Sequence, residues 1–317
     1  MKVLTYIGAV LIAVFSVVLL GCGQTEHGAE KGYTVTDDTG RQVTLRQVPQ
    51  RIVSLTYGTD EIIMEAAPER VIALSKWAGD PEISFVSKEA ADKVGKKVSN
   101  HLEEILALQP DLVLASAAVP EELVKTLEEM KIPVYIACSP KNYEQMKQKV
   151  LGVCAAAGEL EKGKKLAAKM DSDMAALEER LKDLTPEKQK TAVAFSFSGV
   201  MGKKGELFDA MMGLAHVRNG AVAAGLSQGQ VISKEQVVAI DPDIFLLPTW
   251  NYDKKQDVSG YARSVMEDPA YAGCKAVRNQ RMTFVEDRYR YVASHHITEA
   301  VRAIAKAVYP ERFEEET

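Results

Sequence analysis

Short apolar runs alternate with helix-like patterns over most of the chain. Buried strands of a parallel sheet read as continuous apolar runs, because helices cover both faces of the sheet. The alternation therefore predicts two α/β units, one on each side of a long helical stretch. The predicted strands cover residues 51–55, 71–74, 112–115 and 134–137 in the first unit and residues 191–196, 244–247 and 282–285 in the second.

Residues 33–45 have a different pattern, in which side-chain character alternates on both sides of the turn Asp37-Asp38-Thr39-Gly40. Such alternation around a turn is typical of a β-hairpin. We therefore expect a small hairpin before the first α/β unit.

Residues 159–184 are rich in Ala, Leu, Lys and Glu, without Gly after Gly163 and without Pro until Pro186. This composition predicts one long helix of about 35 Å or more, at 1.5 Å per residue. The segment carries too many charges for a buried core helix. We interpret it as a rigid strut between two lobes, and an exposed coiled-coil arm is the alternative.

An internal repeat relates the two α/β units. Residues 102–115 align with residues 234–247, and both copies read as a helix, a Pro-Asp turn and a buried strand. Pro110 and Pro242 end the two helices, because the proline ring blocks helical continuation. The two units are therefore built alike, and a cleft between them is expected.

The first residues have the character of an export signal. Lys2 precedes an uncharged run over residues 3–20, which is followed by Gly21 and Cys22. The order Leu19-Leu20-Gly21-Cys22 resembles a bacterial lipobox, in which the cysteine is lipidated and becomes N-terminal after cleavage. An uncleaved membrane anchor is the alternative, since a span needs at least roughly 17 residues. Either anchor places the rest of the chain outside the cytoplasm, at the cell membrane.

Composition narrows the functional classes. The net charge of −5 and the absence of a basic block argue against nucleic acid as a partner. After Cys22, an odd number of cysteines remains, Cys138, Cys154 and Cys274, without metal-ligand spacing. We interpret them as small buried thiols.

The common catalytic motifs GxGxxG, GxxxxGK[ST] and HExxH are absent from the sequence. The spacing of His296 and Glu299 supplies two potential metal ligands only, so we interpret them as a surface pair. We expect His101 beside a helix cap and His216 in a packing role. The sequence thus predicts neither an enzyme nor a resident metal or cofactor.

Four segments resemble one protein family closely: residues 34–45 (TVTDDTGRQVTL), 49–55 (PQRIVSL), 104–113 (EILALQPDLV) and 275–282 (KAVRNQRM). They are similar to the solute-binding proteins of ABC importers for ferric siderophores, haem and cobalamin, the class III periplasmic binding proteins. The similarity extends over residues 33–313.

The resemblance implies an α/β fold with two Rossmann-like lobes joined by a single long helix. The expected organisation is a signal peptide (1–21), a lipidated tether (22–32), an N-terminal lobe (33–157), a bridging helix (158–185) and a C-terminal lobe (186–317). A monomer is expected.

The resemblance also implies that one acidic residue on each lobe docks onto the membrane permease. The matching positions are Glu103 and Glu235, which the internal repeat aligns. Helix capping is the alternative for Glu103, because residues 100–103 have capping-box spacing. For Glu235 this alternative is weaker, because Ser233 and Gln236 already supply a capping box.

Ligand contacts are expected from loops at the carboxyl ends of strands, where open α/β sheets bind ligands. Aromatic walls with cations suit a large anionic metal complex. We expect a ferric siderophore, with haem or cobalamin as alternatives. If the ligand is haem, Tyr57 is a candidate axial ligand to its iron. A chelatase-like enzyme and a signalling or adhesive lipoprotein are the other classes. The predicted contacts are Tyr57, Lys76, Trp77, Trp250, Tyr252, Arg288, Tyr289 and Arg290.

Overall fold

The computed structural model describes residues 32–227, 229–249 and 257–316. Cys22, Trp250 and Tyr252, three of the predicted functional residues, lie outside these ranges. Within them, two separate sheets of parallel main strands form, each with its own helices. We call the two parts the N-terminal and the C-terminal lobe.

The N-terminal lobe contains a five-stranded parallel sheet in the order β5-β4-β3-β6-β7. Its four longer strands confirm the predicted apolar runs. The sequence pattern missed the two-residue strand β5 at the edge, which is too short to carry a period. The strands are β3 (Ile52–Ser54), β4 (Val71–Ser75), β5 (Lys97–Val98), β6 (Leu112–Ser116) and β7 (Val134–Ala137), and the helices are α1 (Tyr57–Ala66), α2 (Lys88–Val94), α3 (Leu102–Ala107), α4 (Glu121–Glu129) and α5 (Tyr143–Ala156).

The C-terminal lobe has the parallel order β10-β8-β11-β12, and the short strand β9 pairs antiparallel with β8. The strands are β8 (Thr191–Ser196), β9 (Gly199–Val200), β10 (Arg218–Asn219), β11 (Ile244–Leu247) and β12 (Met282–Phe284). The helices are α7 (Leu207–Leu214), α8 (Gly220–Ala223), α9 (Lys234–Ile240), α10 (Val258–Met266), α11 (Lys275–Arg278), α12 (Asp287–Arg290) and α13 (Ile297–Val308).

The internal repeat is reproduced down to its backbone geometry. Gln109 and Asp241, the residues before the two prolines, both have φ of +48°. The aspartates that follow the prolines also have the same role. Asp111 accepts hydrogen bonds from the backbone of Gln50 and Arg51 at the start of β3, and Asp243 accepts one from Thr191 at the start of β8. Each Pro-Asp turn therefore ties its strand to the neighbouring one.

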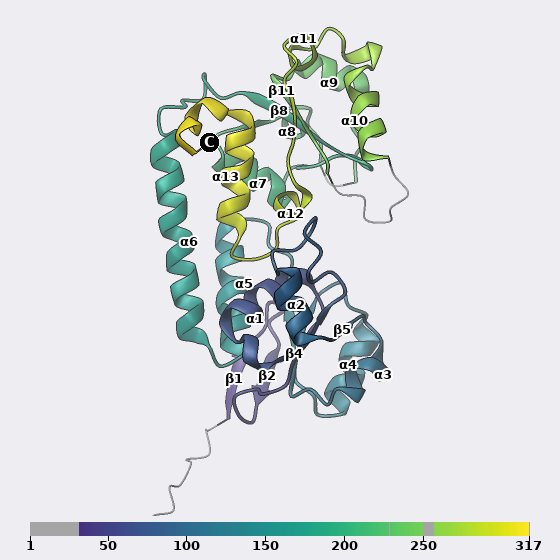
Figure 1. Ribbon diagram of the computed structural model, residues 1–317, viewed down its shortest axis with the longest axis vertical. Coiled ribbons are helices and arrows are strands. Elements are labelled where there is room, and N and C mark those ends of the chain that lie inside the picture. Colours follow the sequence, from purple (N-terminus) through teal and green to yellow (C-terminus); the bar gives the residue numbers. More distant parts are fainter. Residues whose placement is uncertain (1–31, 228, 250–256, 317) are drawn as a thin grey trace, which may run out of the picture. The chain divides into compact units, whose positions relative to one another are not determined.

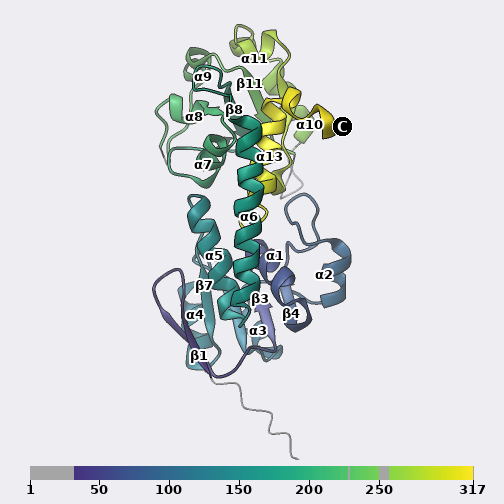
Figure 2. The ribbon, with the colours of Figure 1, turned by 90° about the vertical axis from the view of Figure 1, so that its left-hand side faces the viewer.

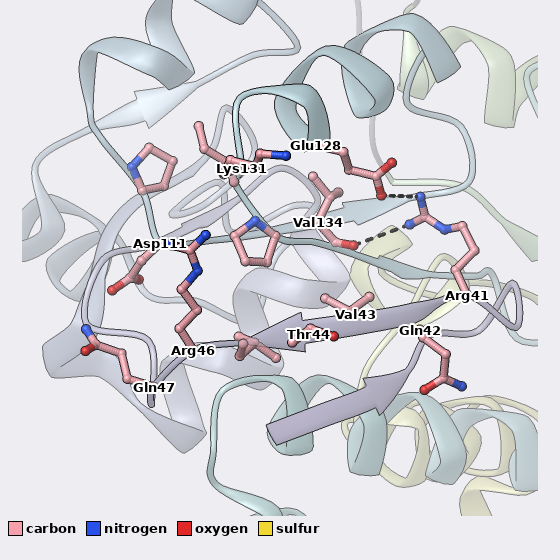
Figure 3. A pocket seen from close by; sticks show the side chains of 14 residues that line it. Arg41, Gln42, Val43, Thr44, Arg46, Gln47, Asp111, Glu128, Lys131 and Val134 are labelled. Atoms are coloured by element: carbon pink, nitrogen blue, oxygen red, sulfur yellow. Dashed lines mark hydrogen bonds and ion pairs between the residues drawn. The ribbon is translucent and has the colours of Figure 1, made fainter. Parts of the chain in front are cut away.

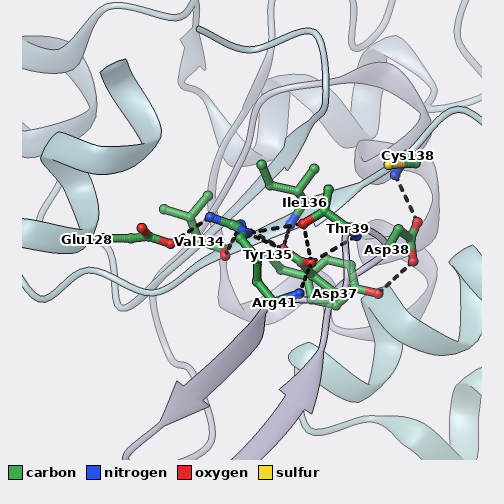
Figure 4. A network of polar contacts seen from close by, with 9 residues as sticks. All are labelled: Asp37, Asp38, Thr39, Arg41, Glu128, Val134, Tyr135, Ile136 and Cys138. Atoms are coloured by element: carbon green, nitrogen blue, oxygen red, sulfur yellow. Dashed lines mark hydrogen bonds and ion pairs between the residues drawn. The ribbon is translucent and has the colours of Figure 1, made fainter. Parts of the chain in front are cut away.

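The predicted hairpin forms from β1 (Tyr33–Thr36) and β2 (Gln42–Leu45). Asp37 at its turn accepts hydrogen bonds from the side chains of Thr39 and Arg41, and Arg41 also donates to the carbonyl of Val134 (Figure 4). Burial opposes ionisation of Asp37, but these hydrogen bonds outweigh it and lower its pKa. The ionised carboxylate thus fastens the hairpin to strand β7.

The long helix α6 (Leu160–Leu181) confirms the predicted helix, with slightly shorter ends. It lies beside α5 of the N-terminal lobe and α13 of the C-terminal lobe (Figures 1 and 2). Its buried residues Met170, Leu177 and Leu181 belong to a core cluster that contains side chains from both sheets. The outer faces of the two sheets carry separate clusters. Helix α6 is therefore packed into the structure on one face, as a strut and not as a free arm.

Candidate functional site

Tyr57 begins helix α1, directly after the carboxyl end of β3. The helix starts here because the Thr56 side chain caps it by accepting a hydrogen bond from the backbone of Thr59. The Tyr57 hydroxyl donates to the carbonyl oxygen of Tyr291 at 2.8 Å. Burial raises the pKa of the Tyr57 phenol, and the charge of Glu61 adds to this effect. A neutral phenol that donates to a carbonyl is not arranged as a tyrosinate ligand for haem iron in this conformation.

Lys76 and Trp77 follow the carboxyl end of β4, as predicted. The Lys76 ammonium lies 4.5 Å from the centre of the Trp77 ring, which is a cation–π contact. Lys76 is exposed and Trp77 is partly buried. This loop therefore offers a cation and an aromatic face to solvent side by side.

Arg288 and Tyr289 lie in helix α12, which follows β12. The Arg288 guanidinium lies 5.0 Å from the Tyr289 ring centre and 5.5 Å from that of Phe85 in the N-terminal lobe. Its Nε atom lies 2.8 Å from Glu286, an ion pair outside hydrogen-bond geometry. The second predicted loop thus repeats the combination of cation and aromatic ring.

Arg290 has different surroundings from its predicted ones. Its side chain is buried, and its guanidinium pairs with Asp287 at 3.2 Å and donates to the carbonyl of Phe195. Asp287 in turn accepts from the backbone of Thr249 at 2.6 Å. Arg290 therefore holds the base of its loop together, and we do not retain it as a ligand contact. The spacing in the sequence could not distinguish it from Arg288 because both follow the same strand.

Two buried acidic residues of helix α1, Asp60 and Glu61, were not among the residues predicted from the sequence. Asp60 is fully buried in α1 and accepts from the backbone and the hydroxyl of Ser75, the latter at 2.5 Å. Burial raises the pKa of Asp60 to about 7. Glu61 accepts from the backbone of Phe85 at 3.1 Å and from the hydroxyl of Ser294 at 2.5 Å. Burial also raises the pKa of Glu61.

A buried lysine accompanies these acids. Burial lowers the pKa of Lys149 in α5 to about 8, against the opposing charges of Asp38 and Glu61. In the sequence, Lys149 lies within the helical pattern of α5, and nothing in that pattern singles it out as buried.

The pair of His296 and Glu299 forms as predicted, with the His296 Nδ1 and Glu299 Oε1 atoms 2.7 Å apart. Burial lowers the pKa of the neighbouring His295 to about 3, so that its ring is neutral at pH 7. Within the described ranges, no three His, Cys, Asp or Glu side chains are arranged to hold a metal ion. His216 is only partly buried, and its ring contacts Glu178 at 2.8 Å rather than a purely apolar surface.

Comparison with known proteins identifies the family. A family model described as periplasmic binding protein matches residues 52–289. The chain belongs to this family. Its fold, two parallel sheets in two lobes, is that of the class III periplasmic binding proteins. The chain is a substrate-binding protein of an ABC importer and has no catalytic function.

Three curated relatives include two whose names state different ligands. An uncharacterized ABC transporter substrate-binding lipoprotein, YvrC of Bacillus subtilis (strain 168), is 24% identical over 97% of each chain. The molybdate-binding protein MolA of Haemophilus influenzae is 25% identical over 89% of this chain and 86% of its own. The Fe(3+)-citrate-binding protein YfmC of Bacillus subtilis (strain 168) is 24% identical over 75% of this chain and 79% of its own.

Among solved structures, the periplasmic haem-binding protein RhuT from Roseiflexus sp. RS-1 in apo form has a TM-score of 0.68. It is 23% identical and covers 83% of this chain and 99% of its own. At this identity the likeness supports the shared fold and leaves the ligand of this periplasmic binding protein open.

The two predicted docking residues of the binding protein are exposed and lie in the first turns of equivalent helices, Glu103 in α3 and Glu235 in α9. The capping box considered as the alternative at residues 100–103 does not form, because His101 is the N-cap of α3 and makes no capping bond. The box of Ser233 and Gln236 is confirmed. A hydrogen bond from Ser233 lowers the pKa of Glu235, which is therefore ionised at neutral pH.

Two surface grooves of the binding protein follow free strand edges. One, of about 870 Å³, lies between β2 and the segment that leads into β7, and Arg41, Arg46, Lys131 and Glu128 are among its lining residues (Figure 3). The other, of about 620 Å³, lies between β12 and α13 and is lined in part by Tyr289. Tyr289 is the one predicted ligand contact that lines either groove within the part of the chain the structure describes.

Proposed function

We propose that this substrate-binding protein carries a ferric complex of an anionic organic chelator, most simply a ferric siderophore. The observation that carries the proposal is the repeated pairing of a cation with an aromatic ring on both predicted ligand loops. Lys76 lies over Trp77, and Arg288 lies over Tyr289. Cations attract the negative charge of the complex, and rings contact its planar or apolar groups.

A ferric siderophore arrives with its iron already coordinated, so the protein needs walls and charges and no metal ligands of its own. The iron-citrate ligand named for YfmC supports this class. Haem is the second candidate, supported by the haem ligand named for RhuT. The engaged hydroxyl of Tyr57 argues against haem bound through that residue.

We also propose that Cys22 carries a lipid anchor and that Glu103 and Glu235 contact the permease. The lipobox-like order of residues 19–22 supports the anchor. The described residues contain no helix with the length and apolar character that a membrane crossing requires. We further propose the lobe boundaries given by the sequence, with residues 158–185 as the bridge.

Titration of the purified protein with ferric citrate, a ferric catecholate siderophore, haemin, cyanocobalamin and molybdate tests the ligand class. The chain has two tryptophans, and Trp77 lies in a predicted ligand loop, so binding of a ferric complex should quench tryptophan emission. Tyr57→Phe should leave binding of a ferric siderophore within a few-fold. Tight binding of molybdate or cyanocobalamin, with no response to ferric complexes, would overturn the proposal.

A further inference from the structure

The Glu61 carboxylate connects two segments that are remote from each other in the sequence. One oxygen accepts from the backbone of Phe85, in the loop that begins with Lys76 and Trp77. The other accepts from the hydroxyl of Ser294, in the segment that follows α12 and Arg288. Glu61 is 4% exposed and Ser294 is 0% exposed, so water does not compete for either bond.

The same face of α1 lies against the segment around Ser294 over more than one turn. The Tyr57 hydroxyl donates to the carbonyl of Tyr291. A Cβ atom on Gly58 would lie 2.6 Å from the carbonyl oxygen of Ala293, so only glycine allows the two backbones to approach this closely. The segment is therefore seated along residues 57, 58 and 61 of the helix.

Phe85 makes a second contact between the two segments. Its ring stacks on His296 with centroids 4.2 Å apart and meets Tyr289 edge-on at 5.5 Å. The backbone of Phe85 is bonded to Glu61, so the carboxylate holds the residue whose ring touches the opposite lobe.

We infer that Glu61 is a positioning residue that holds the loop after β4 and the segment after α12 in one relative arrangement. It thereby sets the separation of the two pairs of predicted ligand contacts, one on each lobe. What these loops bind is taken from the proposed function. The arrangement of the lobes is independent of it and can be measured without a ligand.

Helix α1 offers a matched control for this bond. The neighbouring Asp60 accepts from Ser75 at 2.5 Å, and Ser75 is 1% exposed, but this pair lies within the N-terminal lobe. Ser294→Ala and Ser75→Ala each remove one buried hydroxyl from a buried carboxylate of the same helix. Only Ser294→Ala removes a bond between the lobes.

The experiment measures the distance between spin labels on the exposed residues Lys93 of α2 and Arg263 of α10. The labels are attached through non-canonical amino acids, so the native cysteines are not modified, and the full mature chain is used without ligand. We expect Ser294→Ala to broaden or shift the distance distribution and Ser75→Ala to leave it as in the parent. In Glu61→Gln the amide can still accept from Phe85 and donate to Ser294, so the parent distribution should be largely retained.

The dissociation rate of ferric citrate from the same proteins is the second measurement. Loss of a buried, charge-assisted hydrogen bond should raise this rate about 10-fold in Ser294→Ala. An unchanged distance distribution in folded Ser294→Ala would overturn the inference, whether or not ferric citrate binds. A changed distribution with an unchanged dissociation rate would overturn its extension to the ligand. Failure of the parent to bind any ferric complex would count against the proposed function alone, because the label distances are measured without ligand.

Discussion

The ring of Phe85 lies almost parallel to that of His296, with an angle of 9° between the planes and 4.2 Å between the centroids. Phe85 belongs to the N-terminal lobe and His296 precedes α13 of the C-terminal lobe. An aromatic pair of this kind contributes roughly 0.5–1.5 kcal/mol beyond the area that it buries. The stack is therefore a specific contact between two lobes that share one core cluster.

Phe85→Ala should lower the free energy of unfolding by about 2–3 kcal/mol, because Phe85 is only partly buried but loses its stacking partners. Equilibrium urea denaturation measures this change. Phe284→Ala is the control, since Phe284 is 51% exposed and should change stability by less than about 0.5 kcal/mol. Equal effects of the two substitutions would contradict the assigned role of Phe85.

Asp60 should make stability depend on pH in an unusual direction. Burial raises its pKa to about 7 from 3.8. Between these two values the folded state keeps a proton that the unfolded state releases, so the contribution of Asp60 to stability falls as pH rises. Asp60→Asn cannot ionise. It should gain stability relative to the parent by up to about 4 kcal/mol between pH 4 and pH 8. Urea denaturation at several pH values checks this, and parallel pH profiles for the two proteins would refute it.

Arg288 and Arg290 should respond differently to substitution. Arg290→Met leaves Asp287 buried without its cation and should cost about 3–5 kcal/mol of stability. Arg288→Ala removes a partly exposed ion pair and should cost about 1 kcal/mol or less. Under the proposed function, it should also weaken binding of an anionic ferric complex about 10-fold. Thermal denaturation and titration of the same samples separate the two effects.

Glu103→Gln combined with Glu235→Gln should abolish import while ligand affinity stays within a few-fold, because complementary charges govern such docking. Uptake of radioactive iron by cells that express the variant measures this. Glu104→Gln combined with Glu122→Gln is the matched control, since both residues are exposed acids in first helical turns. Normal uptake by a stably expressed Glu103/Glu235 variant would exclude the proposed docking role.

Cys22→Ala should release the protein from the membrane fraction or leave its precursor unprocessed. A single acyl chain binds membranes only marginally, at about 0.8 kcal/mol per buried methylene, so firm attachment requires two or more chains. Labelling with radioactive palmitate tests the anchor directly. Absence of label from the parent protein would mean that the order of residues 19–22 had been misread.

Local patterns in the sequence were sufficient for most of the fold. The apolar runs predicted the longer strands and the composition of residues 159–184 predicted α6, because strands and helices depend on neighbours a few positions apart. The repeat predicted that the two lobes are alike, and Gln109 and Asp241 share even their left-handed backbone conformation. The capping box considered as an alternative at residues 100–103 does not form, because the helix begins one residue later.

The sequence by itself also determined the family and the loops from which ligand contacts are expected, since both follow from motifs and strand ends. The tertiary structure decided which side chains of those loops are available. Arg288 and Arg290 have the same sequence signal, but the fold buries one of them against Asp287. The bond between Glu61 and Ser294 joins residues 233 positions apart. No local pattern encodes such a pair, because its partners meet only when the two lobes pack together.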